Sequence, residues 1–307
     1  MKTIVIAYDG SECSEAILTE LQHAGLPREL DAHVVSVVEL WAAPMPDPGA
    51  WSPMPAVLPA VASSEAEEDE AMRRAGSLAE KGAARLRAAF PGWRVVAAGP
   101  VGSVARAIVQ RAREVSADMI FIGSHSRSAV GRFFLGSVSQ KVAAEAKCSV
   151  RICRPRPHSG AAPRLLVAVD GSAPSQAAVQ LVAERAWPAG TAVAVINVVE
   201  PRLRAVMADL PPEYAVEILR QHEARLDWLE TVATAAHHQL EIPGVVTERH
   251  TLDGEPKHTL LEWAERWKAD CLFIGASGLQ HPGTETLGTV ASALAVRAHC
   301  SVEIVRP

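Results

Sequence analysis

The sequence predicts an α/β protein made of two repeated, doubly wound domains, each built around a five-stranded parallel sheet. The chain repeats itself: TIVIAYDGSECSEA at residues 3–16 matches LLVAVDGSAPSQA at residues 165–177, and CSVRICRP at residues 148–155 matches CSVEIVRP at residues 300–307. Within each copy, apolar β-branched runs alternate with longer segments of helical composition, a pattern typical of parallel strands joined by right-handed crossovers. A length of 307 residues also suffices for about two domains.

The first copy begins with a continuous apolar β-branched run, which is typical of a strand buried on both faces. Asp9, Gly10 and Ser11 then offer a turn and the start of a helix. The long helix after the second strand begins acidic and ends basic, which suits the helix dipole. The predicted strands are residues 3–8, 33–40, 93–98, 118–123 and 149–153, and the predicted helices are residues 13–24, 64–90, 103–115 and 138–146.

The second copy repeats this order. Its predicted strands are residues 164–170, 192–200, 245–252, 271–275 and 301–305, and a helix is predicted at residues 290–298. Linker composition between the copies divides the chain into a first domain at residues 1–155, a linker at 156–163 and a second domain at 164–307. The first copy is the longer one, and we expect its excess in the Pro-rich residues 40–60, which cannot continue a central strand or a helix.

The composition is that of an ordinary globular protein, with 49% hydrophobic residues and a formal net charge of −5. We expect no nucleic-acid partner, because a basic footprint is missing, and no membrane partner, because no apolar stretch reaches the roughly 18 residues of a span. The start of the chain lacks the apolar core of a secretory signal. Five scattered cysteines without a C-x-x-C pair predict reduced, mostly buried thiols in the cytoplasm, and no metal ligands.

Two loops carry the most informative pattern: FIGSHSRSAVGRFFLGS at residues 121–137 and FIGASGLQHPGTETLGT at residues 273–289. Each leaves a strand through a glycine and ends at a second glycine followed by a hydroxyl residue. Glycines let backbone amides approach a ligand closely, and a helix N-terminus presents free N–H groups and the positive end of its dipole. The pattern therefore indicates a phosphate cradle, distinct from a Walker A loop. The alternative is a plain glycine-bounded loop in which Thr289 caps a helix.

Both copies resemble the universal stress protein family, in its tandem form, over nearly the whole chain. Residues 275–289 fit the Gly-x2-Gly-x9-Gly-[Ser/Thr] pattern of the family's nucleotide-binding members. The strand-end Asp, the AD-x4-G approach to the loop and the last strand also look like that family. The resemblance implies a Rossmann-like, adenine nucleotide alpha hydrolase-like fold that binds ATP, alone or with Mg²⁺.

The resemblance also implies roles for particular residues. Asp170 is expected at the ribose or adenine end of ATP, and Val198 near the base. Backbone and hydroxyl groups of the loop are expected to hold the phosphates, at Gly275, Gly278, Gly288 and Thr289. The matching positions of the first copy are Asp9, Val37, Gly123, Gly136 and Ser137.

The first copy departs from the family pattern at Ser126, where the second has Gly278. A Cβ there narrows the cradle, or strains a residue that disfavours φ > 0 by about 1–3 kcal/mol. Arg127 and Arg132 in the same loop either offset this through charge-assisted contacts with phosphate or are solvated surface residues. We therefore expect tight binding in the second copy and weak or no binding in the first.

We interpret the protein as an ATP-binding stress-response or signalling module. One alternative is a slow ATPase or phosphotransferase, which needs a positioned base near the γ-phosphate. His281 and Glu285 in one loop and His125 in the other do not recur in both, so no catalytic residue is assigned. The other alternative is an interaction scaffold that has lost nucleotide binding.

The fifth strands of the two copies are predicted to lie at sheet edges, where unpaired backbone groups favour pairing with another strand. Val150 and Ile152 share one face of the first strand, as Val302 and Ile304 do in the second. We expect the two strands to pair into a pseudo-symmetric unit, either within one chain or between two chains as a homodimer.

Overall fold

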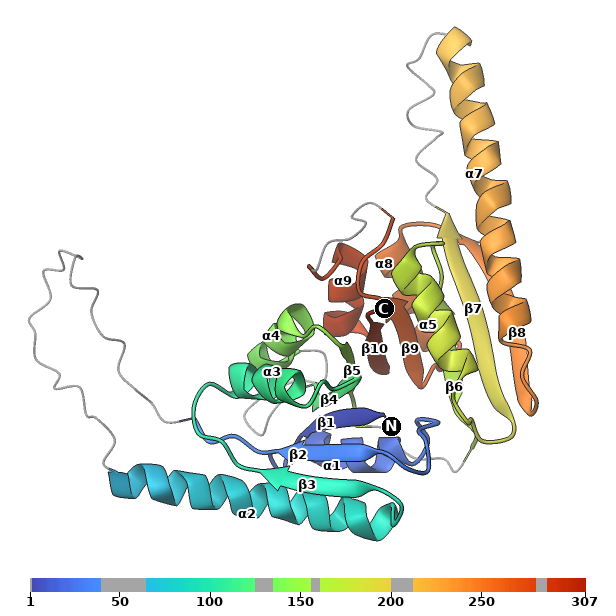
Figure 1. Ribbon diagram of the computed structural model, residues 1–307. Helices are drawn as coiled ribbons and strands as arrows, with labels where there is room; N and C mark the ends of the chain where they lie inside the picture. Colours follow the sequence, from blue (N-terminus) through green and yellow to red (C-terminus); the bar gives the residue numbers. More distant parts are fainter. Residues whose placement is uncertain (1, 40–64, 125–134, 156–160, 200–211, 280–285) are drawn as a thin grey trace, which may run out of the picture.

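Ten strands of the chain form one sheet. The structure is a computed structural model that describes residues 2–39, 65–124, 135–155, 161–199, 212–279 and 286–307. The strand order is β3-β2-β1-β4-β5-β10-β9-β6-β7-β8 (Figure 1). Neighbouring strands are parallel except β5 and β10, which are antiparallel. Two five-stranded parallel sheets are thus joined at their fifth strands, as predicted, and the junction lies within one chain.

The described elements follow the predicted order in both repeats. The first repeat contains β1 (Thr3–Ala7), α1 (Glu12–Leu21), β2 (Asp31–Val35), α2 (Glu65–Ala89), β3 (Arg94–Ala98), α3 (Val104–Glu114), β4 (Met119–Gly123), α4 (Ser137–Glu145) and β5 (Ser149–Cys153). The second contains β6 (Arg164–Ala168), α5 (Ala173–Ala183), β7 (Thr191–Val199), α7 (Pro212–Gln239), β8 (Val245–Asp253), α8 (Pro256–Arg266), β9 (Cys271–Gly275), α9 (Thr289–Arg297) and β10 (Ser301–Val305). The Pro-rich residues 40–60 lie outside the described residues.

The second strand of the first repeat is shorter than predicted. It was expected to reach residue 40, but β2 ends at Val35, where it is level with Ala7 on one neighbouring strand and Ala98 on the other. Both neighbours end there, so no regular ladder remains for the residues that follow. Within the described residues, an isolated bridge between Val38 and Val101 continues the pairing.

Side-chain caps fix the first helix of each repeat. The Ser11 hydroxyl accepts the backbone N–H of Ser14 at 3.2 Å, and the Ser172 hydroxyl accepts that of Ser175 at 3.3 Å. A cap of this kind stabilises a helix by about 1 kcal/mol. Because each serine follows the strand-end Asp by two residues, the caps also fix the position of that Asp.

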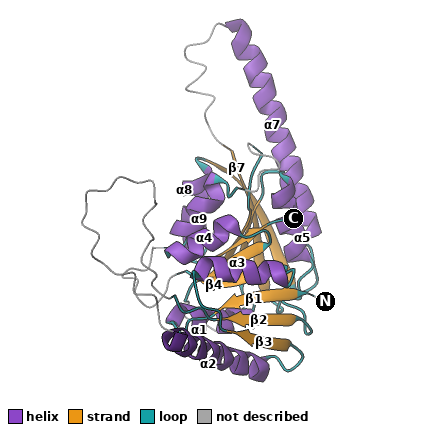
Figure 2. Ribbon diagram, turned by 60° about the vertical axis from the view of Figure 1, so that its left-hand side comes forward, coloured by secondary structure: helices purple, strands orange, loops and turns teal. Residues whose placement is uncertain are grey.

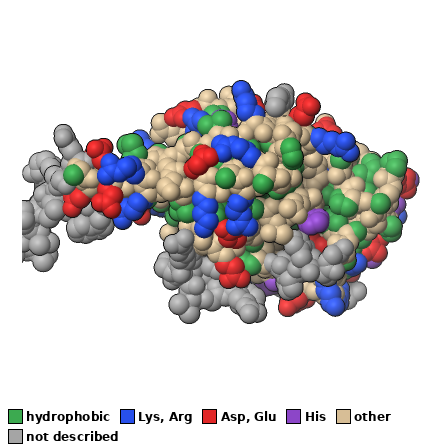
Figure 3. Space-filling model, turned by 90° about the horizontal axis from the view of Figure 1, so that it is seen from below, with side chains coloured by type: hydrophobic (Ala, Val, Ile, Leu, Met, Phe, Trp, Pro, Cys, Tyr) green, Lys and Arg blue, Asp and Glu red, His purple; other side chains and the backbone are tan. Residues whose placement is uncertain are grey.

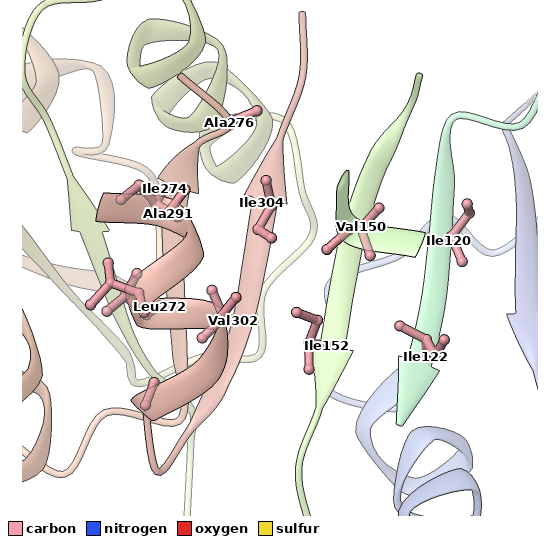
Figure 4. Packing of buried hydrophobic residues seen from close by; sticks show 14 of the residues in the cluster. Ile120, Ile122, Val150, Ile152, Leu272, Ile274, Ala276, Ala291, Val302 and Ile304 are labelled. Carbon is pink, nitrogen blue, oxygen red and sulfur yellow. The ribbon is translucent and has the colours of Figure 1, made fainter. Parts of the chain in front are cut away.

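The two faces of the sheet are packed differently. Helices α3, α4, α8 and α9 cover one face, and α1, α2, α5 and α7 cover the other (Figures 1 and 2). On the first face one continuous apolar core passes through both repeats. At its centre the side chains of Val150 and Ile152 meet those of Val302 and Ile304 (Figure 4). On the second face each repeat has a core of its own.

One face of the molecule can be seen in Figure 3. It carries both acidic and basic side chains, with hydrophobic side chains among them. No helix in the described part of the chain combines the length and apolar character needed to cross a bilayer.

All five cysteines are free thiols, and four of them are buried. Burial raises the pKa of the Cys300 thiol to about 12 and those of Cys153 and Cys271 well above the ordinary value. The half-buried Cys148 also has a raised pKa, through burial. These thiols therefore remain protonated at neutral pH.

We predict that iodoacetamide at pH 8 alkylates Cys148 first and leaves Cys153, Cys271 and Cys300 unmodified until the chain unfolds. Burial blocks the reagent, and the raised pKa keeps the thiolate fraction low. Peptide mass spectrometry of folded protein, with a urea-denatured sample as the control, measures this. Rapid alkylation of Cys271 or Cys300 in the folded chain would contradict the packing of β9 and β10.

Candidate functional site

Each repeat places an Asp just after its first strand, beside the point where the strand order reverses. Parallel α/β sheets bind ligands in the crevice at this point. Asp9 Oδ1 accepts the backbone N–H of Ser11 at 2.9 Å. Asp170 Oδ1 accepts the backbone N–H of Ser172 at 3.0 Å and its hydroxyl at 2.6 Å. In both repeats the turn therefore holds one oxygen of the carboxylate, Oδ1.

The glycine loops close in the same way in both repeats. The backbone N–H of Gly136 donates to Ser124 O, and that of Gly288 donates to Ala276 O, each at 2.7 Å. These bonds bring the end of each loop back beside the strand it left. The middle of each loop, residues 125–134 and 280–285, lies outside the described residues, and so do His125, Arg127, Arg132, His281 and Glu285.

A helix begins at the end of each loop with its N-terminus uncapped by a side chain. Gly136 and Gly288 are the N-cap residues of α4 and α9, and neither has a side chain that can accept the first-turn amides. Ser137 and Thr289 follow at the first helical position and are exposed. Thr289 is therefore not the N-cap. First-turn amides without a side-chain cap, together with an exposed hydroxyl, are suited to an anion.

The second glycine of the loop in the second repeat packs against the strand-end Asp. A Cβ on Gly278 would lie 2.7 Å from Asp170 Oδ2, closer than a real Cβ contact allows. The next residue, Leu279, donates its backbone N–H to the same oxygen at 3.3 Å. Asp170 and the loop are thus in direct contact. The sequence analysis predicted separate roles for them, Asp170 at the ribose or adenine end of ATP and Gly278 at the phosphates. The matching residue of the first repeat, Ser126, lies outside the described residues.

The first glycine of each loop is required by packing against a helix. A Cβ on Gly275 would lie 2.7 Å from Pro174 Cβ and 2.8 Å from the Pro174 backbone. On Gly123 it would lie 2.8 Å from Cys13 Cβ. These glycines therefore allow β4 and β9 to approach α1 and α5 closely. Their expected contact with phosphate stays a prediction.

The predicted base contacts lie on the same face of the sheet as the helix N-termini. Val37 follows β2, Val198 is near the end of β7, and both are half-buried against the core shared with α4 and α9. In each repeat, the strand-end Asp, the valine and the uncapped helix therefore share the carboxyl ends of the strands. The described candidate residues of each repeat therefore lie together at the end of the sheet where the parallel strands terminate.

The two candidate sites differ in what supports them. In the first, the Tyr8 hydroxyl donates to Glu15, which also pairs with Arg85, whereas the second has Val169 at the matching position. Burial and the Glu15 carboxylate raise the pKa of Tyr8 to about 12. Cys13 Sγ lies 3.7 Å from Ser124 Oγ in the first repeat. The residue of the second repeat that matches Cys13 is Pro174. The first site is therefore a variant of the second, not a copy.

The fold and the site define a tandem, doubly wound α/β protein with a strand-end Asp and a glycine loop in each repeat. The universal stress protein family profile matches the chain twice, over residues 1–154 and 162–306. The chain belongs to the universal stress protein family.

Similarity to known proteins covers one repeat or both. A universal stress protein of Thermus aquaticus is 35% identical over 153 residues, which are 50% of this chain and 98% of the relative. The crystal structure of a universal stress protein from Archaeoglobus fulgidus covers 99% of this chain and 98% of its own at 20% identity, with a TM-score of 0.64. This chain is also similar to a family member from Arabidopsis thaliana, solved with AMP bound, which covers 47% of this chain and 90% of its own at 22% identity, with a TM-score of 0.33.

We predict that Gly275→Ala lowers the free energy of unfolding by about 1–3 kcal/mol, because its Cβ overlaps the backbone of Pro174. Gly76→Ala is the matched control: nothing lies within 4 Å of its Cβ, and alanine in a helix interior is favoured by roughly 0.5–1 kcal/mol. Urea unfolding of both variants measures the difference. Equal stabilities would show that β9 does not approach α5 as described.

Proposed function

We propose that this protein is a cytoplasmic, nucleotide-responsive stress or signalling module that binds ATP, and that the second repeat is its main binding site. The observation that carries the proposal is the unit formed by Asp170, Gly278 and Leu279 beside the N-terminus of α9. It combines a carboxylate held by a turn, a glycine at which a Cβ would meet that carboxylate, and a helix N-terminus without a side-chain cap. The adenine identity of the ligand rests on the family resemblance of the loop pattern.

The residues of the second repeat suit the parts of a nucleotide. Asp170 Oδ2 accepts one N–H at 3.3 Å, and a carboxylate oxygen can accept more than one bond, so it can also take a ribose hydroxyl. Val198 offers an apolar contact for the base. The first-turn amides of α9, which have no side-chain cap, and the exposed Thr289 hydroxyl suit the phosphates, which the positive end of the helix dipole favours.

The two sites should bind with unequal affinity. On the geometry of the second repeat, a Cβ at the position of Gly278 meets the strand-end carboxylate, and the first repeat has Ser126 at that position. Loss of one or two charge-assisted hydrogen bonds, each about 1.5–3 kcal/mol, weakens binding by roughly one to four decades.

We predict that ATP titrated into ligand-free protein occupies about one tight site per chain, and that Gly278→Val abolishes it. The valine pushes the loop away from Asp170, because even a Cβ lies 2.7 Å from Oδ2. Ser126→Gly should strengthen the residual binding of the first repeat. Isothermal calorimetry with and without Mg²⁺ measures both effects.

Gly76→Ala serves as the control for the second site in this titration, because it changes a glycine of α2 in the first repeat. Two equivalent tight sites, or tight binding that survives Gly278→Val, would overturn the ranking. Absence of any adenine nucleotide binding would favour the scaffold alternative. Release of phosphate from ATP at stoichiometric protein would favour the slow ATPase.

A further inference from the structure

Part of the contact between β5 and β10 is symmetric: equivalent residues of the two repeats make equivalent hydrogen bonds to the other repeat. Arg154, after β5, donates to Ala295 O at 2.5 Å and to Cys300 O at 3.0 Å in the second repeat. Its repeat equivalent Arg306, after β10, donates to Ala143 O at 2.6 Å and to Cys148 O at 3.4 Å in the first. Each arginine therefore satisfies carbonyl groups at the end of the partner repeat's last helix.

Two serines follow the same reciprocal pattern. The backbone N–H of Arg154 donates to Ser301 Oγ, and that of Arg306 donates to Ser149 Oγ, each at 3.1 Å. Every one of these contacts would form equally well if a fifth strand paired with a second copy of itself. They hold two fifth strands together without selecting which two.

The centre of the contact is not symmetric. Arg151 lies directly opposite Glu303 in the antiparallel register, and its Nη1 donates to Glu303 Oε2 at 3.0 Å. The two side chains are 3% and 0% exposed, so water screens their charges very little. Their buried charges are on the face opposite the continuous apolar core, between the separate cores of the two repeats.

One further charge from each repeat completes the central row. Arg151 also donates to Glu20 of α1, at 2.9 and 2.6 Å. Glu303 also accepts from Arg185, just after α5, through both of its oxygens. The order Glu20, Arg151, Glu303, Arg185 alternates in sign, and each repeat supplies one acid and one arginine. The repeat equivalents of Glu20 and Arg185 are Leu181 and Ala24, so this row is not inherited from the repeat pattern.

A two-fold arrangement of identical strands brings the central residue against its own copy. Two β5 strands paired in this register would bury Arg151 against Arg151, and two β10 strands would bury Glu303 against Glu303. Like charges directly opposite one another destabilise a strand pair, and more so without water. A buried charge pair is weak evidence for stability, but choice of partner and register is its best-attested role.

We propose that the Arg151–Glu303 pair makes this a heterotypic interface, which accepts the other repeat as partner and rejects a second copy of the same strand. The reciprocal hydrogen bonds of Arg154, Arg306, Ser149 and Ser301 stabilise any pairing of two fifth strands. The central charges of Arg151 and Glu303 determine which two fifth strands pair. The chain therefore closes on itself, and its fifth strands do not join another chain.

Two full-length variants test this choice. In one, Glu20→Arg/Arg151→Glu inverts the ion pair of the first repeat; in the other, Arg185→Glu/Glu303→Arg inverts that of the second. Each repeat keeps an ion pair of its own, but like charges meet at the centre within each chain. Amide exchange at residues 149–153 and 301–305 should be about 100-fold faster than in the unchanged protein, while β1 and β6 stay protected.

Mixing the two variants restores alternating charges, but only between chains. The mixture should regain slow exchange in both fifth strands and show the mass of two chains by light scattering. The chain with all four substitutions alternates within itself, so it should regain protection as a single chain. Glu230→Arg/Arg249→Glu, which inverts an ion pair remote from the interface, should leave the fifth strands unchanged.

Unchanged exchange in either two-substitution variant would overturn the proposal, because like charges at the centre would then be tolerated. Failure of both the mixture and the four-substitution chain to regain protection would also overturn it, since alternation would then not be what selects the partner. Recovery in either one supports it, including the case in which the two-substitution variants alone are unfolded.

Discussion

The antiparallel pairing of β5 with β10 is the contact on which the rest of the structure depends. Both strands are buried along their whole length, and each is hydrogen-bonded on both edges. On one face the pairing joins the helix-covered halves into a single apolar core. Without the partner, a repeat would expose an unpaired strand edge together with valine and isoleucine side chains, which is a site for aggregation. The two repeats therefore cover one another along their fifth strands.

The same pairing sets where function can lie. Because β5 and β10 are antiparallel, the strands of the two repeats run in opposite directions. The carboxyl ends of the strands of one repeat therefore lie at the opposite end of the sheet from those of the other repeat. Each candidate site is consequently built from the residues of one repeat. Such sites can diverge separately, and the described residues have done so: Tyr8 and Cys13 in the first repeat stand where the second has Val169 and Pro174. The contacts of Arg154 and Arg306, which lie at the pairing itself, are equivalent in the two repeats.

Much of this was predictable from the sequence, and the remainder depended on contacts between distant residues. Repetition and hydrophobic pattern predicted the strands, and the alternation of Val150 and Ile152 predicted a covered fifth strand. β2 ends early because both neighbouring strands end level with Val35. The hydrophobic pattern of β2 itself carries no information about where its neighbours end. The packing of Gly275 against α5 and of Gly278 against Asp170 could not be predicted from the sequence, because each contact joins residues that are about 100 positions apart in the chain. Arg151 and Glu303 occupy matching positions with opposite charge, and this was the one available signal of their pairing.

Amide exchange of the unchanged protein under native conditions tests the central claim most directly, since it measures whether the two repeats open separately or together. Because both strands are paired on both edges, the amides of residues 149–153 and 301–305 should be among the slowest to exchange. The free energy of opening obtained from their exchange should equal the free energy of global unfolding measured in urea. Exchange of these amides within seconds, while β1 and β6 remain protected, would show that the fifth strands are not paired.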